Sequence, residues 1–338
     1  MPESVVDQIF ARLREQAVTL FPDHGPCRII RLVGHTPKPD HYTYDAVMEF
    51  AHSPERITCK VYRGKGKDAS PKAAAERELH NVSRVYEGFS QRGYAGVPRP
   101  LGDFSESGAV VLQKVPGLPL QSIIMKAALL PGYADDAGLA RAAQATGEWL
   151  RNFHSALADG TVPLDQSKIL DELETLCTNC RSEGLEDRDI QTILTGAKHS
   201  LGKAKRHLPA SAVLNDFTPL NVAIAENGVY YCEFANMSER GLGLNDVAYF
   251  MACVEALEKY PFCNREITSR IQEEFFSAYG MTEDQRAVVR VLKIKALLKM
   301  FAAGRNVKDT AVRKKVMWAN VMKRFIHQAA NRTLRNAA

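Results

Sequence analysis

The hydrophobic pattern of the chain changes near residue 117, and this change limits what the chain can fold into. Before it, short β-branched and aromatic runs are separated by segments rich in Pro, Asp and His, as in an antiparallel meander. After it, apolar residues recur mostly at helical spacing. This order predicts an α+β protein with two lobes, and a ligand is expected in the crevice between them.

The part before the change predicts a helix and then a five-stranded antiparallel sheet with one long helix. Residues 1–21 carry a helical apolar stripe, and residues 22–115 hold the sheet. The strands are expected at 27–34, 42–51, 56–64, 97–104 and 108–117, and the long helix at 71–89. Pro71, near the start of that helix, is typical of a first helical turn. The two lobes are expected to join at 115–117.

Residues 116–338 predict a mainly helical lobe. Helices are expected at 137–158, 167–182, 187–203, 246–259, 265–279 and 283–303. The only strands predicted in this lobe flank a loop within 213–224 and lie within 228–236. Its last helices are rich in lysine and arginine.

Composition places the chain among ordinary globular proteins. Hydrophobic residues make up 45% of it and charged residues 25%, and no apolar run approaches the roughly 20 residues that span a bilayer. The N-terminus lacks the apolar core of a secretion signal. Seven cysteines favour free thiols in a reducing compartment, so we expect a cytoplasmic protein. Cys177 and Cys180 are interpreted as two thiols one helical turn apart, because no second Cys or His pair completes a zinc site.

The positive charge of the chain is concentrated at one end. The net charge is +5, but residues 290–338 carry 13 Lys or Arg and one acid, so residues 1–289 sum to −7. This asymmetry indicates contact with something anionic, such as a phosphorylated substrate, nucleic acid or a membrane surface. Aromatic residues are not interleaved there as in base-stacking proteins, which argues against nucleic acid and leaves peripheral membrane contact open.

The alternative for this basic segment is purely structural. The bases would face water while apolar residues of the same helices are buried. These apolar residues are Leu297, Leu298, Phe301, Val316, Trp318 and Val321.

The stretch VLNDFTPLNVAI, residues 213–224, holds two polar side chains in a short loop. Asp216 and Asn221 lie on either side of Pro219, between two apolar runs that read as strand ends. Proline stiffens the turn, so the two side chains should keep their separation. The loop is therefore a candidate site with two groups rich in oxygen.

Three further polar residues lie at positions that point to a site. Lys60 is in the middle of the strand ITCKVY, where the alternation turns it to one face, and Glu233 is near the end of the run VYYCEF. Glu78 shares a helical stripe with Val82 and Val85. Each has an ordinary structural interpretation alone, as a snorkelling lysine or a solvated acid. Their combination with the loop, in this order across two lobes, favours a site.

Seven segments carry a resemblance to a known family. They are CKVY, RELHNV, VPRPLG, VVLQKVPG, ATGEWLRNFHSAL, DFTPLNV and EFANMSERGLGLNDVAYF, and they cover residues 57–250. The chain is similar to the aminoglycoside phosphotransferase and choline kinase branch of the protein-kinase-like fold. The most specific element is D-x-x-P-x-N, followed by an acidic-Phe pair and a downstream Asp-x-Ala.

The resemblance implies an ATP-dependent phosphotransferase. Residues 22–115 would be the N-lobe that binds the nucleotide, and residues 116–338 the C-lobe with the catalytic loop and the substrate site. Lys60 would hold the α- and β-phosphates of ATP, oriented by an ion pair with Glu78. Asp216 would be the catalytic base, which accepts or positions the proton of the substrate hydroxyl.

The resemblance also implies a metal site and an adenine site. Asn221 and Glu233 would bind Mg²⁺, for which oxygen ligands are suited. The hinge that meets adenine through backbone groups would be formed by Gln113, Lys114 and Val115. Asp246 resembles the structural aspartate of the family, which caps a helix and contacts the catalytic loop. The acceptor would be a hydroxyl of a small molecule or a glycan, the latter because DFTPLN resembles a DFTPWN variant in phosphotransferases linked to bacterial surface polysaccharide.

Three features depart from the family pattern. Leu214 and Asn215 replace the usual His-Gly, and Glu233 replaces an aspartate. The loop at 34–42 has one glycine and two prolines in place of G-x-G-x-x-G. These departures motivate an alternative, a catalytically degenerate kinase-like protein that binds nucleotide or a partner without turnover. A third hypothesis is binding of nucleic acid or an anionic membrane through residues 290–338.

Overall fold

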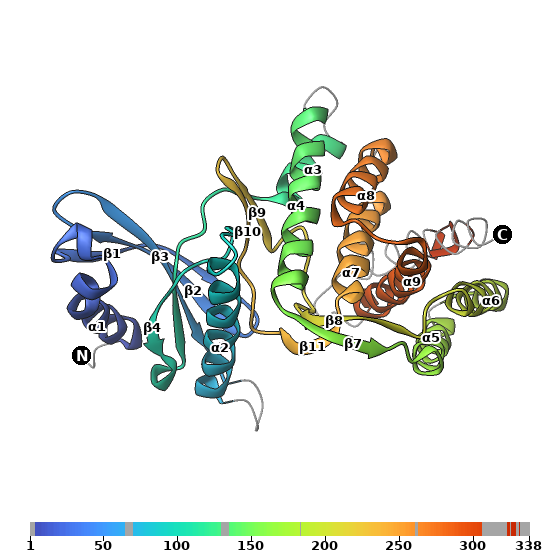
Figure 1. The fold of residues 1–338 in the computed structure, drawn as a ribbon, viewed down its shortest axis with the longest axis horizontal. Coiled ribbons are helices and arrows are strands. Elements are labelled where there is room, and N and C mark those ends of the chain that lie inside the picture. The colour runs from blue at the N-terminus through green and yellow to red at the C-terminus, as the bar shows by residue number, and fades with distance from the viewer. Residues whose placement is uncertain are drawn as a thin grey trace. The chain divides into compact units, whose positions relative to one another are not determined.

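The computed structural model describes residues 4–64, 70–129, 135–182, 184–260, 263–305, 323–324, 326–328 and 331 (Figure 1). The chain divides into two compact units. The first contains Met1–Gly117 and Ala225–Met237, and the second contains Leu118–Ile224 and Ser238–Ala338. The first is mainly a sheet and the second mainly helical, so the predicted α+β class is confirmed.

The described part of the first unit is built on a five-stranded antiparallel sheet with the strand order β1-β2-β3-β5-β4. Its strands are β1 (Ile29–Pro37), β2 (His41–Glu49), β3 (Pro54–Tyr62), β4 (Pro100–Phe104) and β5 (Ala109–Gln113). Its helices are α1 (Val5–Leu20), α2 (Pro71–Ser90) and the short 3₁₀ turns η1 (Pro22–His24) and η2 (Ser105–Ser107). The five predicted strands and both predicted helices are therefore present.

The two long helices of this unit begin where local chemistry favours it. Ser4 and Asp7 form a capping box at the start of α1, in which each side chain bonds the backbone N–H of the other. The hydroxyl of Ser70 accepts a bond from the N–H of Ala73, and Pro71 follows as the first residue of α2.

Side chains alternate along β3, so one face of the strand contributes to the hydrophobic core and the other face to the candidate site. Cys59 is fully buried in a cluster with Ile9 and Leu13 of α1 and with residues of β2 and β5. Lys60, the next residue, turns to the other face, where it meets Glu78 of α2. The same strand therefore contributes to the hydrophobic core and presents a lysine toward α2.

The second unit is mainly helical. Its helices are α3 (Leu120–Leu129), α4 (Asp136–Ala156), α5 (Gln166–Arg181), α6 (Asp187–Gly202), α7 (Leu244–Glu255), α8 (Arg265–Tyr279) and α9 (Glu283–Arg305), with the 3₁₀ turn η3 (Ala256–Lys259) after α7. All six predicted helices are present. Leu297, Leu298 and Phe301 of α9 are fully buried, whereas Val316, Trp318 and Val321 lie outside the described residues.

The expectation that strands of this lobe occur only within 213–224 and 228–236 was wrong. β8 (His207–Val213) pairs antiparallel with β7 (Ala158–Pro163) and β11 (Ser238–Leu242), and β6 (Leu118–Pro119) pairs with β9 (Val222–Ala225). β7 and β11 are polar edge strands whose residues are largely exposed, so they have no apolar alternation to reveal them.

The chain returns to the first unit after the loop of Asp216 and Asn221, which the sequence prediction did not include. Ala225–Met237 groups with the first unit and contains β10 (Gly228–Tyr231). The N–H of Tyr231 donates to the carbonyl of Gly96 in the same unit. Among the described residues, no helix is long and apolar enough to cross a membrane.

Candidate active site

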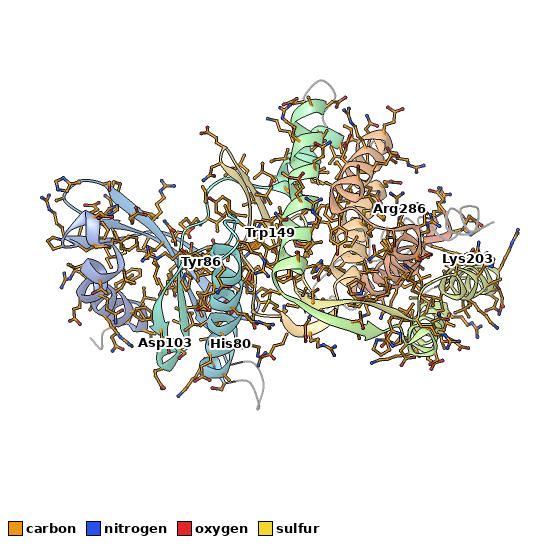
Figure 2. The ribbon with its side chains drawn as sticks, in the orientation of Figure 1. His80, Tyr86, Asp103, Trp149, Lys203 and Arg286 are labelled. Atoms are coloured by element: carbon orange, nitrogen blue, oxygen red, sulfur yellow. The ribbon has the colours of Figure 1, made fainter. Side chains whose placement is uncertain are left out.

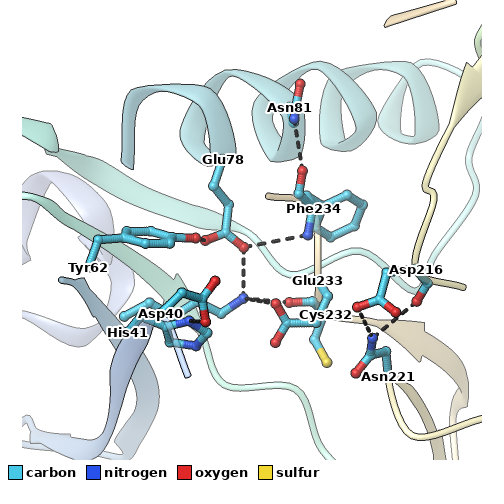
Figure 3. A network of polar contacts seen from close by, with 11 residues as sticks. Asp40, His41, Tyr62, Glu78, Asn81, Asp216, Asn221, Cys232, Glu233 and Phe234 are labelled. Carbon is cyan, nitrogen blue, oxygen red and sulfur yellow. Dashed lines mark hydrogen bonds and ion pairs between the residues drawn. The ribbon is translucent and has the colours of Figure 1, made fainter. Parts of the chain in front are cut away.

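Lys60 is buried in the first unit and bonded to three oxygen atoms. Its ammonium donates to Glu78 Oε1 at 2.7 Å, to the carbonyl of Cys232 at 2.9 Å and to Glu233 Oε2 at 3.0 Å (Figure 3). Only 4% of the lysine side chain is exposed, against 24% for Glu233. A lysine ammonium has three N–H donors, so these three acceptors use all of them.

The charges around Lys60 stabilise one another. Burial alone would lower the pKa of Lys60, but the carboxylates of Glu78 and Glu233 outweigh it and raise that pKa above its usual value. Glu78 is fully buried and also accepts a bond from the Tyr62 hydroxyl. Burial and the carboxylate of Glu78 raise the pKa of Tyr62, so its phenol stays a neutral donor. The lysine is therefore a fixed positive charge in a low-dielectric setting.

The segment that carries Glu233 is tied to α2. Asn81 Nδ2 donates to the carbonyls of Phe234 at 2.8 Å and Met237 at 3.4 Å. Phe234 is fully buried and packs edge-on against Tyr231. Sequence reasoning did not single out Asn81, although it follows Glu78 by three residues and so shares its helix face. The bonds of Asn81 hold the backbone segment from which the side chain of Glu233 reaches Lys60.

The predicted hinge residues take part in the sheet and its edge. The N–H of Gln113 donates to the carbonyl of Arg99, and the N–H of Lys114 donates to the carbonyl of Arg56, both at 2.8 Å. The ammonium of Lys114 bonds Asp45 at 2.6 Å. Contact with adenine would therefore use other backbone groups of Gln113 and Lys114, or those of Val115, and the hinge role stays a prediction.

The loop in the second unit joins its two polar residues by hydrogen bonds. Asn221 Nδ2 donates to the carboxylate of Asp216 and to its backbone carbonyl, each at 3.0 Å (Figure 3). The amide oxygen of Asn221 is on the other side of its amide group, so it is directed away from Asp216. Asn215 has φ of 63°, a left-handed conformation that asparagine tolerates better than most residues.

A buried aspartate supports this loop from α7. Asp246 is fully buried and accepts the N–H groups of Leu214 at 2.8 Å and Asn215 at 2.9 Å. His154 of α4 bonds the same carboxylate at 3.1 Å through Nε2 and the Tyr279 hydroxyl at 2.8 Å through Nδ1. The contact with the loop matches what the resemblance implies, but α7 has Gly243 at its N-cap and no side-chain cap.

Two residues of this network were missed in the sequence. His154 lies on the inward stripe of α4 next to Phe153, and Tyr279 ends α8. A single polar residue on an apolar helix face was the available signal. Leu214 is fully buried, and the side chain that bonds Asp246 from α4 is His154.

Aromatic packing fixes the backbone beside Asp216. Phe217 is fully buried and lies parallel to Trp149 of α4, with ring centroids 5.8 Å apart. Figure 2 labels Trp149 on this helix. Phe217 also contacts Phe250 of α7, with ring centroids 5.5 Å apart. The residue after the proposed base is thus anchored in the core of the second unit, which restricts where the carboxylate of Asp216 can lie.

Replacing Asp246 with alanine should destabilise the protein by about 3 kcal/mol or more, because buried N–H groups of Leu214 and Asn215 would lose their acceptor. Urea unfolding followed by circular dichroism measures this. The control is Asp159→Ala, which removes an exposed ion pair with Arg240 and should cost less than about 0.5 kcal/mol. Equal losses in the two variants would contradict the supporting role of Asp246.

Cys177 and Cys180 lie on one helix, as the structural interpretation of the pair expects. None of the seven cysteines forms a disulfide, and burial raises the pKa of Cys177 to about 12. Cys177 and Cys180 are buried on α5. The described residues contain no group of three or more His, Cys, Asp or Glu that could hold a metal ion. The predicted magnesium ligands, Asn221 and Glu233, are one amide and one carboxylate and would not form such a group.

Comparison with known proteins shows the fold. No family model matches the chain, and no curated protein matches it. Among solved structures, the choline kinase from Cryptosporidium parvum Iowa II has a TM-score of 0.55 at 13% identity, over 98% of this chain and 97% of that one. The amicoumacin kinase in complex with AMP-PNP, Ca²⁺ and its ligand Ami has a TM-score of 0.53 at 13% identity, over 94% and 93%.

An aminoglycoside phosphotransferase also matches. It is a thermostable mutant in a ternary complex with AMP-PNP and hygromycin B, with a TM-score of 0.50 at 12% identity over 96% of this chain and 98% of that one. The chain therefore has the protein-kinase-like fold shared by aminoglycoside phosphotransferases and choline kinases. The fold implied by the sequence resemblance is confirmed.

Proposed function

We propose that the protein is an ATP-dependent phosphotransferase that moves the γ-phosphoryl group of ATP to a hydroxyl group of a small molecule or glycan. The observation that carries this proposal is the buried ammonium of Lys60, held by Glu78 and adjacent to the carboxylate of Glu233. Phosphoryl transfer needs fixed positive charge and positioning more than covalent help from the protein. The fold, which similar kinases share, supports the same reaction class.

Lys60 binds phosphate oxygens by exchanging one of its present acceptors. Its three donors are all used, so a triphosphate has to replace one acceptor. Glu78 is fully buried and is also bonded by Tyr62, so it remains in place as the orienting partner. Glu233 is the more exposed carboxylate, and its release from Lys60 makes its oxygens available to a metal ion.

The loop residues of the second unit supply the other groups. Asp216 takes the proton of the acceptor hydroxyl, while its bond from Asn221 Nδ2 holds the carboxylate in one orientation. The amide oxygen of Asn221 and the carboxylate of Glu233 are hard oxygen ligands of the kind that Mg²⁺ prefers. Mg²⁺, when bound, neutralises the negative charge of the triphosphate. In the balanced reaction, the acceptor oxygen bonds to the γ-phosphorus, the bond to the bridging oxygen breaks, and ADP leaves.

Formation of ADP from ATP tests this function without knowledge of the acceptor, because water serves as a slow acceptor in its place. We expect ADP formation that requires Mg²⁺ and stops when EDTA is added. The same assay on Asp216→Asn separates the reaction from a contaminating ATPase. Turnover that does not depend on a metal ion would contradict the proposal, and so would equal turnover in the wild type and in Asp216→Asn.

A second candidate function is nucleotide binding without turnover. The observation that favours it is the ion pair between Lys60 and Glu233, because the longer acid reaches the lysine that should hold phosphates. In that case ATP with Mg²⁺ should raise the melting temperature of the protein, and ADP should not accumulate above the level of the Asp216→Asn variant.

Replacing Glu233 with aspartate should leave the rate of ADP formation within about threefold of the wild type or raise it, because the shorter acid keeps two oxygen ligands. Glu233→Gln should lower the rate about 10- to 100-fold, because it removes a charged ligand. Steady-state rates at varied MgATP measure both effects. Complete loss in Glu233→Asp would mean that the site is built around the longer side chain.

A further inference from the structure

The second unit contains a pocket of about 530 Å³ beside the loop of Asp216. The loop contributes Asn215, and the helices α5, α7 and α9 contribute the remaining described lining. α9 packs against both α5 and α7 (Figure 1). The polar residues of the lining are Asn215, Asn245, Tyr249, Glu172, Lys295 and Lys299. The pocket lies within one unit, and its apolar lining comes from α9.

Two observations place this pocket next to the proposed base. Asn215 lines it and directly precedes Asp216 in the loop. Tyr249 also lines it, and burial raises the pKa of Tyr249 to about 12, with the nearby Cys253 and Asp216 adding to the effect. The influence of Asp216 means that the phenol lies within electrostatic reach of that carboxylate. A ligand in the pocket therefore lies beside the loop that carries Asp216, in contact with the residue that precedes it.

The charge of the lining is positive. Lys295 bonds Glu172, and this bond from Lys295 holds the pKa of Glu172 below its usual value, so the pair is ionised and nearly neutral as a whole. Lys299 is exposed and lies one helical turn after Lys295 on α9. The described lining contains no second carboxylate, so Lys299 leaves an excess of one positive charge.

A neighbouring hollow differs from this pocket in its lining residues. It shares Glu172 and Lys299 with the pocket but is bordered by Asp165, Lys168 and Asp171 of the α5 region. Its described lining includes neither Asn215 nor Tyr249, and Asp165 caps α5 by accepting the N–H of Lys168. Asp165 and Asp171 therefore line this hollow and not the pocket beside the loop.

We propose that the pocket binds the acceptor and selects an alcohol that carries a negative charge, as a phosphate or a carboxylate. Lys299 is the residue that sets this preference, because its charge attracts an anionic group and repels an ammonium group. The inference rests on the proposed function, since it names the substrate class of the same site.

Three probes with one hexose ring test the charge preference: glucose 6-phosphate, glucuronate and glucosamine. Their dissociation constants are measured by calorimetry with saturating AMP-PNP and Mg²⁺, which keeps the phosphate probe out of the nucleotide site. The wild type should bind at least one of the two anionic probes more tightly than glucosamine, and the tighter one identifies the anionic group. Lys299→Glu should weaken that probe about tenfold and strengthen glucosamine, because the variant changes the local charge by two.

Lys198→Glu is the matched control, because Lys198 is an exposed lysine on α6 that does not belong to the lining. It should change each affinity by less than about twofold, since an exposed charge outside the lining is screened by salt. Tighter or equal binding of glucosamine by the wild type, or the same affinities in Lys299→Glu, would overturn the inference.

Measurement of ADP formation on the same samples separates this inference from the proposed function. Turnover without a preference for anionic probes would overturn the inference and leave the phosphotransferase in place. A preference that depends on Lys299 but comes without turnover would overturn the phosphotransferase alone and leave an anion-selective pocket.

Discussion

Asp216→Asn should lower the rate of ADP formation about a thousandfold, with little change in the KM for MgATP. The carboxylate takes a proton from the acceptor in our mechanism, and loss of a positioned general base typically costs 10²- to 10⁴-fold. The fold should be retained, because the oxygen of the new amide still accepts the bond that Asn221 Nδ2 makes to Asp216 at 3.0 Å. Steady-state kinetics at varied MgATP separates the effect on kcat from the effect on KM.

Asp159→Asn is the control for this variant, because Asp159 is an exposed aspartate of the second unit paired with Arg240. It should keep the rate of the wild type within about twofold, as expected for a surface substitution. The urea midpoint of both variants should equal that of the wild type. A folded Asp216→Asn protein with more than a third of the wild-type kcat would remove Asp216 from the mechanism.

Lys60→Met should both abolish turnover and destabilise the protein. The rate of ADP formation should fall more than a hundredfold, because the fixed positive charge for the phosphates is lost. The free energy of unfolding should fall by about 3–5 kcal/mol, because Glu78 would be left buried without its cation. Urea unfolding and the ADP assay measure the two effects on the same preparation.

A double variant separates stability from chemistry at this position. Lys60→Met combined with Glu78→Gln removes both buried charges, so it should recover much of the lost stability and none of the turnover. Lys72→Met is the control, since Lys72 is a half-exposed lysine paired with Glu106 and Glu76. Recovery of turnover in the double variant would mean that Lys60 serves only to neutralise Glu78.

The residues of the candidate site could be predicted where local periodicity decides the direction of a side chain. The period of two along β3 predicts that Lys60 and Cys59 lie on opposite faces of the sheet, as they do. The helical stripe of α2 predicts that Glu78 faces inward, and it is fully buried. The roles of these residues in catalysis stay predictions.

The parts that the sequence did not reveal depend on long-range pairing or on single polar residues. β7 and β11 are short and exposed, so only their pairing with β8 makes them strands. The hydrophobic periodicity of the sequence does not show that Ala225–Met237 returns to the first unit, because this return is a property of the chain topology. His154 and Asn81 are polar residues within apolar helix faces, and their partners become known only in three dimensions.

The central claim is that Lys60 and Glu233 of the first unit and Asp216 and Asn221 of the second serve one nucleotide. A crystal structure with AMP-PNP and Mg²⁺ tests it most directly. We predict a metal ion bound by Asn221 Oδ1 and a Glu233 carboxylate oxygen at about 2.1 Å, and Lys60 Nζ about 3 Å from phosphate oxygens. A bound nucleotide whose metal contacts neither Asn221 nor Glu233, with Lys60 still bonded to Glu233, would contradict the account.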